Sequence, residues 1–118
     1  MKTSPVKIHS RVAIEKCYLA RSFFARFMGL MGRKSLPANE AILFPACNSI
    51  HTLFMRFPID VVSLDAKGKV VKVREAMGPW RVTFPSRAVK HTLELRAFQS
   101  RKLGIHVGAV LEFSGGWI

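Results

Sequence analysis

Cys47 and His51 are the two side chains whose types could act as a nucleophile and its base. A nearby imidazole activates a thiol by favouring the thiolate. In an extended strand, residues four positions apart share a face but are separated by roughly 13 Å. That distance is too long for a hydrogen bond, so the pair would need a bend in the chain to meet. Two interpretations stay open: a catalytic pair, and a buried cysteine beside a histidine that only packs.

Asp60 is a lone carboxylate in an apolar stretch, where Ile59 and Val61 flank it. A charge in such a place lies either at the surface end of a strand or is paired inside the protein. We expect Asp60 to be structural. Its carboxylate should accept hydrogen bonds from an arginine, for which Arg56 and Arg81 are candidates, or from backbone N–H groups.

Two further features could serve a site near this segment. Acid–base catalysis at Asp60 would need a second titratable group, and Glu94 is the candidate. Trp80 and Arg81 follow a break in the chain at Gly78–Pro79. They either contact a ligand, since loops carry function, or close one end of the β scaffold while Arg81 reaches outward.

The soft metal ligands of the chain are cysteines and histidines whose spacing matches no zinc pattern: Cys17, Cys47, His9, His51, His91 and His106. We therefore predict no metal and no cofactor. Two cysteines do not make a disulfide framework, and we expect two buried thiols rather than a bridge. The sequence has no apolar run of signal-peptide or membrane-spanning length, which predicts a cytoplasmic protein without a membrane span.

The charge of the chain is strongly positive, with a net charge of +12 from 19 Lys and Arg against 7 Asp and Glu. Eight cations lie in the first 34 residues: Lys2, Lys7, Arg11, Lys16, Arg21, Arg26, Arg33 and Lys34. Such a surface attracts polyanions, or else only keeps the protein soluble. No recognition helix, zinc finger or aromatic ribonucleoprotein motif is present, so nucleic-acid binding should be weak and non-specific.

The elements that must position these side chains are mostly strands. β-branched and aromatic runs predict strands within 4–18 and at 42–44, 49–55, 59–64, 70–73, 89–95 and 107–113, with a turn at 65–68. Helical spacing predicts a short helix at about 21–33, and a helical turn is expected near 97–103. We predict one domain, residues 1–118. Its class is mainly β (α+β), a small β-sandwich or barrel-like domain with one or two short helices.

Two runs of the sequence resemble the signatures of a known family. The runs are FMGLMGRKSLPANEAILFP and IHTLFMRFPIDVVSLDAKGKVVKV, and the later GPWR and LEL segments resemble its C-terminal part. The family is domain of unknown function 192, small uncharacterised bacterial and archaeal proteins. The resemblance implies a small, mainly β fold and no particular reaction. This chain departs from the family pattern at Arg56-Phe57, at Phe98 and at Ala109.

The leading hypothesis is a non-catalytic binding or accessory module for an anionic ligand or partner. Its candidate ligand-binding residues are His51, Arg56, Asp60, Trp80 and Arg81. The first alternative is a hydrolase-type enzyme that uses Cys47 or His51 with Asp60. The second is a non-specific polyanion binder that uses the basic N-terminal third. The sequence identifies neither the ligand nor the oligomeric state.

Overall fold

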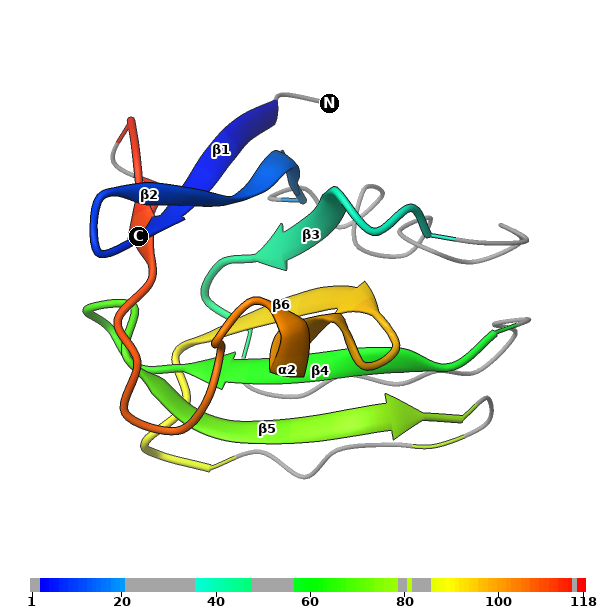
Figure 1. Ribbon diagram of the computed structural model, residues 1–118. Helices are drawn as coiled ribbons and strands as arrows, with labels where there is room; N and C mark the ends of the chain where they lie inside the picture. The colour runs from blue at the N-terminus through cyan, green and yellow to red at the C-terminus, as the bar shows by residue number, and fades with distance from the viewer. Residues whose placement is uncertain (1–2, 21–35, 48–56, 79–80, 82–85, 116) are drawn as a thin grey trace.

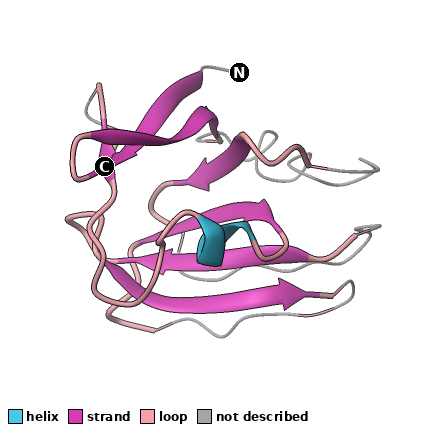
Figure 2. Ribbon diagram, viewed as in Figure 1, coloured by secondary structure: helices cyan, strands magenta, loops and turns pink. Residues whose placement is uncertain are grey.

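A computed structural model describes residues 3–20, 36–47, 57–78, 81, 86–115 and 117–118 of the chain. Strands dominate this part (Figures 1 and 2): β1 (Thr3–Ile8), β2 (Arg11–Leu19), β3 (Glu40–Phe44), β4 (Ile59–Leu64), β5 (Val70–Met77), β6 (His91–Arg96) and β7 (Glu112–Phe113). One short helix, α2 (Gln99–Lys102), follows β6. The predicted excess of strand over helix is confirmed.

The strands form one seven-stranded sheet with the order β5-β4-β6-β3-β2-β1-β7. Every neighbouring pair is antiparallel except β2 and β3, which run parallel. The chain leading into β7 also reaches the other end of the sheet. The Val70 N–H donates to the Ala109 carbonyl at 2.8 Å, and the Leu111 N–H donates to the Gly68 carbonyl at 2.9 Å. The sheet is thereby curled into a barrel-like form, as predicted.

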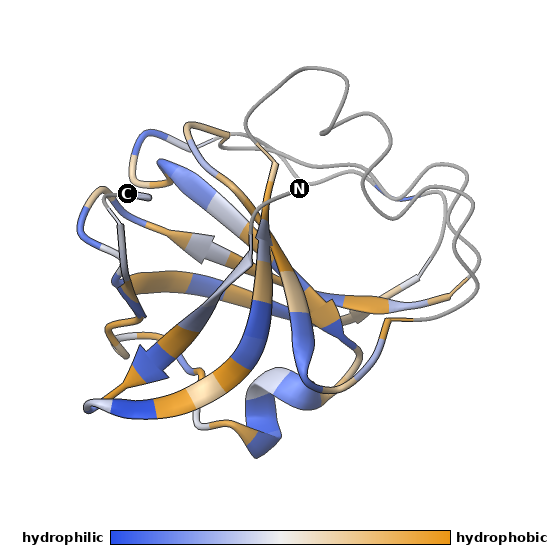
Figure 3. Ribbon diagram, turned by 90° about the horizontal axis from the view of Figure 1, so that it is seen from above, coloured by the Kyte–Doolittle hydropathy of each residue, from blue (hydrophilic) through white to orange (hydrophobic). Residues whose placement is uncertain are grey.

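The main core lies on one face of this curled sheet. Hydrophobic and hydrophilic residues alternate along the strands (Figure 3), because successive side chains of a strand point to opposite faces. The larger cluster of buried side chains draws on six strands, the segments that follow α2, and the C-terminal residues: Val6, Ile14, Cys17, Ala41, Leu43, Val62, Leu64, Val70, Leu93, Leu95, Ile105, Leu111 and Trp117.

A second cluster occupies the opposite face of β3 and β4 and includes the last residue of β5. Its buried members are Ala20, Leu36, Ile42, Phe44, Ile59, Val61 and Met77. In β4 the two clusters alternate residue by residue: Val61 belongs to the second and Val62 to the first. Two distinct faces of the same strands are therefore buried, and a polar residue on either face is enclosed.

The residues of the turn between β4 and β5 explain its conformation. In the predicted turn at 65–68, the Asp65 carboxylate accepts hydrogen bonds from the N–H groups of Lys67 (2.8 Å) and Lys69 (2.9 Å). Gly68 closes this turn with a φ of +86°, and a Cβ there would lie 2.6 Å from the Leu111 carbonyl oxygen. Only glycine fits both the dihedral angle and the close approach.

The prediction of a strand over 107–113 is wrong in its extent. Only Glu112–Phe113 forms a strand, and Val110 makes an isolated bridge with Lys69. Gly108 adopts a φ of +95°, which interrupts the extended conformation. The predicted helix at 21–33 and the predicted strand at 49–55 lie outside the described residues. No helix in the described part of the chain is long and apolar enough to span a membrane.

Candidate functional site

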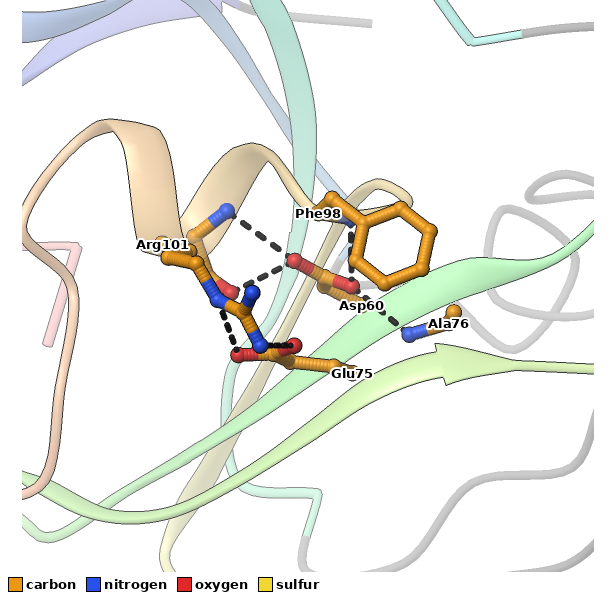
Figure 4. Close-up of polar contacts among 6 residues, drawn as sticks. Asp60, Glu75, Ala76, Phe98 and Arg101 are labelled. Atoms are coloured by element: carbon orange, nitrogen blue, oxygen red, sulfur yellow. Dashed lines mark hydrogen bonds and ion pairs between the residues drawn. The ribbon is translucent and has the colours of Figure 1, made fainter.

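Asp60 lies at the centre of a hydrogen-bond network between β4, β5 and the start of α2 (Figure 4). Its Oδ1 accepts from the N–H groups of Ala76 (2.8 Å) and Phe98 (2.9 Å). Its Oδ2 accepts from the N–H of Ser100 at 3.0 Å and from the hydroxyl of the same residue at 2.5 Å. The side chain is fully buried. The prediction that Asp60 accepts from backbone N–H groups is confirmed.

This network stabilises two unusual backbone positions. Ala76 and Phe98 have φ angles of +47° and +67°, a region that side chains rarely adopt. Each directs its N–H at the Asp60 carboxylate, so the anion compensates for the strain. Outside this network, Arg101 binds Glu75 through two contacts, at 2.7 and 3.3 Å. All four donors to Asp60 come from the described part of the protein, so the carboxylate joins β4 to β5 and to the start of α2.

Glu94 is the second buried carboxyl group, with 3% of its surface exposed. It lies opposite Ile42 on β3 and Val61 on β4, so its side chain shares a face with the second cluster. No hydrogen-bond donor from the described residues reaches it. Burial raises the pKa of Glu94 to about 8, because the charged form loses its hydration. At neutral pH this carboxyl group is mostly protonated and can donate a hydrogen bond.

Cys47 belongs to the same side of the sheet as Glu94. It packs against the second cluster, and its carbonyl accepts a hydrogen bond from the Thr92 hydroxyl at 2.7 Å. The preceding Ala46, with a φ of +54°, donates its N–H to Nδ1 of His91 at 2.9 Å. Asp60 faces the opposite side of β4. The structure therefore does not bring Cys47 and Asp60 together, and the hydrolase hypothesis gains no support from that pair.

The remaining sequence-predicted site residues are not assembled in the described part of the chain. His51, Arg56 and Trp80 lie outside the described residues. Arg81 is exposed. Both cysteines are thiols: Cys17 is buried and Cys47 half-buried. Burial raises the pKa of the Cys17 thiol to about 12, which keeps it protonated and unreactive.

A groove of about 880 Å³ lies between the end of the β1–β2 hairpin and the chain that follows α2. The described residues that line it are Ile8, His9, Arg11, Val12, Ala13, Lys102, Leu103, Gly104, His106, Gly108, Ala109, Val110 and Glu112. Two of them, Arg11 and Lys102, are cations without an ion pair among the described residues, and two are histidines. The volume falls within the usual range for small-ligand sites.

The hairpin end is fixed by its own turn residues and by β7. His9 and Ser10 have φ angles of +51° and +64°, as a two-residue hairpin of the favoured type requires. The Ser10 N–H donates to Oε1 of Glu112 at 2.8 Å. Glu112 is the one acidic residue among those that line the groove, and this bond ties it to the hairpin. Arg11, the cation next to this turn, therefore lies on a hairpin end that is tied to β7.

Sequence reasoning missed the groove. In the sequence, Arg11 stands out only as one of eight N-terminal cations, Lys102 only as part of the helical turn expected near 97–103, and His106 only as one of the soft metal ligands. About 90 positions separate the two walls, so no local pattern could join them. A smaller cavity of about 380 Å³ lies beside the second cluster, between Leu36–Pro37, Phe57–Pro58 and Arg96–Ala97. The described residues that line this cavity are mostly apolar, and Arg96 is the one cation among them.

Comparison with known proteins gives a consistent result. The model of a family described as DUF192, "Uncharacterized ACR, COG1430", matches residues 5–113. A UPF0127 protein of Pyrococcus furiosus is 35% identical over 102 residues, which cover 80% of this chain and 84% of that protein. A UPF0127 protein of Thermococcus kodakarensis is 33% identical over 105 residues, which cover 84% of this chain and 65% of the relative.

Two crystal structures share the fold. A protein of unknown function from Novosphingobium aromaticivorans has a TM-score of 0.80 at 23% identity, covering 94% of this chain and 85% of its own. A candidate transcription regulator from Sinorhizobium meliloti has a TM-score of 0.73 at 25% identity, covering 82% of this chain and 80% of its own. These likenesses support the barrel-like architecture and assign no ligand to it.

Proposed function

The chain belongs to the DUF192 family, and we propose that it acts as a non-catalytic binding module for an anionic ligand or partner. The groove between the β1–β2 hairpin and the chain after α2 is the proposed site. One observation carries the proposal: Arg11 and Lys102 line the same groove from opposite ends of the sequence, and neither has an ion pair among the described residues. Two guanidinium or ammonium groups facing one groove attract a carboxylate or phosphate.

The electrostatics of the groove support an anion over a cation. Glu112 is the acid among its described lining residues, and its Oε1 already accepts the Ser10 N–H. His9 and His106 add imidazole groups that hydrogen-bond an anion when protonated. The net charge of +12 adds a long-range attraction that raises the association rate. A non-catalytic role fits the Asp60 carboxylate, whose hydrogen bonds all serve the fold.

The test is titration with pyrophosphate at low ionic strength, followed by calorimetry. The double variant Arg11→Glu/Lys102→Glu should bind at least about tenfold more weakly, because two attractive charges become repulsive. The matched control is Lys72→Glu/Arg87→Glu, which changes the net charge equally at two exposed positions that do not line the groove. The control should bind nearly as the wild type does. If both double variants lost the same affinity for pyrophosphate, the loss would come from net charge and not from the groove. If the wild type did not bind pyrophosphate, the proposal would be refuted.

A second candidate function is non-specific binding of a polyanion such as DNA. It is favoured by the net charge of +12 and by the description of one structural neighbour as a candidate transcription regulator. Anisotropy of a labelled duplex against salt tests it. Affinity should fall steeply with salt and be alike for unrelated sequences, because phosphate contacts carry no sequence information. Salt-insensitive, sequence-selective binding would contradict this candidate, as would no binding at low salt.

A further inference from the structure

β2 has an edge that is only partly used. On one side, β1 pairs with β2 from Arg11 to Tyr18. On the other side, β3 pairs with β2 only from Lys16 to Leu19. Among the described residues, the Arg11–Glu15 half of β2 therefore has no strand neighbour on the β3 side. An unpaired strand edge presents a row of N–H and C=O groups that can template another strand.

The proposed anion-binding groove borders the same half of β2. Arg11, Val12 and Ala13 all line it, although successive side chains of a strand point to opposite faces. The groove therefore borders this half of β2, and it also takes in Ile8 of β1 and Glu112 of β7. The opposite wall is Lys102, the last residue of α2, together with the chain that follows it, which includes Gly104. The groove is thus bounded by the β1–β2 hairpin and Glu112 on one side and by a separate segment on the other.

Ala13 gives the edge a further feature. In the β1–β2 ladder, Lys7 pairs with Val12 and Val6 pairs with Ile14, so Ala13 has no partner in the register. This is the arrangement of a β-bulge, in which the extra residue of one strand is left out of the ladder. The bulge lies on the β1 side of β2, whereas the opposite edge is open because β3 pairs with β2 only from Lys16 onward.

The side chains of the groove indicate what kind of strand would fit. Val12 and Val110 are 54% and 51% exposed, which is high for apolar residues. Arg11 and Lys102 supply positive charge beside them. An occupant with an extended backbone, small apolar side chains on one face and carboxylates would match all three features.

We propose that an extended, acidic peptide segment of a partner protein adds to the Arg11–Glu15 edge of β2 as an extra strand. This inference rests on the proposed function, since it names the class of anion that the groove receives. Main-chain hydrogen bonds to β2 supply affinity, and the two cations select carboxylates. The five edge residues span roughly 17 Å at about 3.4 Å per residue, enough to hold a short peptide.

The experiment uses the full chain and a short synthetic peptide of alternating aspartate and valine. Two modified peptides carry N-methyl groups on alternate amides, one on the odd positions and one on the even positions. Only alternate N–H groups of an added strand point at β2. One N-methyl series should therefore lose at least about tenfold in affinity, while the other should bind nearly as the parent does. Amide hydrogen exchange should slow at those N–H groups of the Arg11–Glu15 edge that point away from β1 when the parent peptide binds.

The outcomes separate this inference from the proposed function. Equal binding of the parent and both N-methyl peptides would overturn strand addition and leave anion binding intact. The same conclusion follows if pyrophosphate binds in the groove and the peptide does not. If neither probe binds, the proposed function fails as well. Sedimentation of the chain alone tests a second copy as the occupant: a dimer that the peptide dissociates would overturn the partner-protein assignment.

Discussion

Asp60 and Glu94 are both buried carboxyl groups on neighbouring strands, yet they face opposite sides of one sheet. Asp60 accepts four hydrogen bonds, three of them from backbone N–H groups. Glu94 receives none from the described residues, and burial raises its pKa to about 8. Burial by itself therefore does not decide what a carboxyl group does. The donors around it decide whether it links separate elements through hydrogen bonds, as Asp60 does, or is left to the effect of burial, which favours the neutral form of Glu94.

The largest effect is expected at Asp60. Asp60→Asn replaces Oδ2 with an NH₂ group, which would face the Ser100 N–H donor to donor. A buried N–H that loses its acceptor costs about 1–3 kcal/mol, and the weakening of the other hydrogen bonds to the former carboxylate adds to this cost. We expect the free energy of unfolding to fall by about 3 kcal/mol, measured by urea denaturation. An unchanged unfolding midpoint would show that the network does not stabilise the fold.

Glu94 should instead make stability depend on pH. Its pKa is higher in the folded protein, about 8, than in the unfolded chain, where a glutamate titrates near 4.5. Between these values the folded state keeps a proton that the unfolded state has released. The free energy of unfolding should therefore fall as pH rises through this window, by up to about 1.4 kcal/mol per pH unit. Below it, the contribution is fully present.

The matched variant for this test is Glu94→Gln, which is neutral at every pH. Urea denaturation of both proteins at several pH values between about 5 and 8 gives the free energy of unfolding as a function of pH. Only in the wild type should the titration of Glu94 contribute to the slope of that dependence. Burial lowers the pKa of His91, which adds an opposing slope at and below its usual range. Both proteins share that slope, so their difference isolates Glu94. Parallel curves would argue that Glu94 titrates normally.

A smaller effect is expected when one donor to Asp60 is removed. Ser100→Ala deletes the hydroxyl that donates to Oδ2 but leaves the backbone N–H of the same residue in place. Since three donors remain, we expect a loss of about 1–2 kcal/mol, less than for Asp60→Asn. Thermal unfolding of the two single variants and the double variant would measure their coupling. Strictly additive losses would mean that the two side chains do not act through one network.

The smallest effect is expected outside the network, at the ion pair of Arg101 with Glu75. Their side chains are 72% and 32% exposed, so water screens the attraction. Arg101→Gln should lower the free energy of unfolding by less than about 1 kcal/mol. The loss should shrink further in high salt, as followed by denaturation at two salt concentrations. A loss as large as that of Asp60→Asn would mean that the pair, and not the carboxylate, holds α2.

Much of the fold was predictable from local pattern. The run from Ile59 to Leu64 forms β4 with the predicted bounds, because β-branched residues favour strands. The segment 107–113 was not predictable in the same way. Its residues read as a strand, but Gly108 turns the chain and its hydrogen bonds go to the Gly68–Val70 region. A glycine inside an apolar run signals an interruption without showing where the next backbone partner lies.

The sequence by itself indicated a structural role for Asp60, because a charge between Ile59 and Val61 lies either at the surface end of a strand or paired inside the protein. It also determined the excess of positive charge. Only the tertiary structure decided which groups meet. Ser100 reaches Asp60 across 40 positions, and Lys102 joins Arg11 across 91. The physical reason is that strand pattern fixes which face a side chain takes, whereas sheet order and curl fix its neighbours, and those depend on the packing of the whole chain.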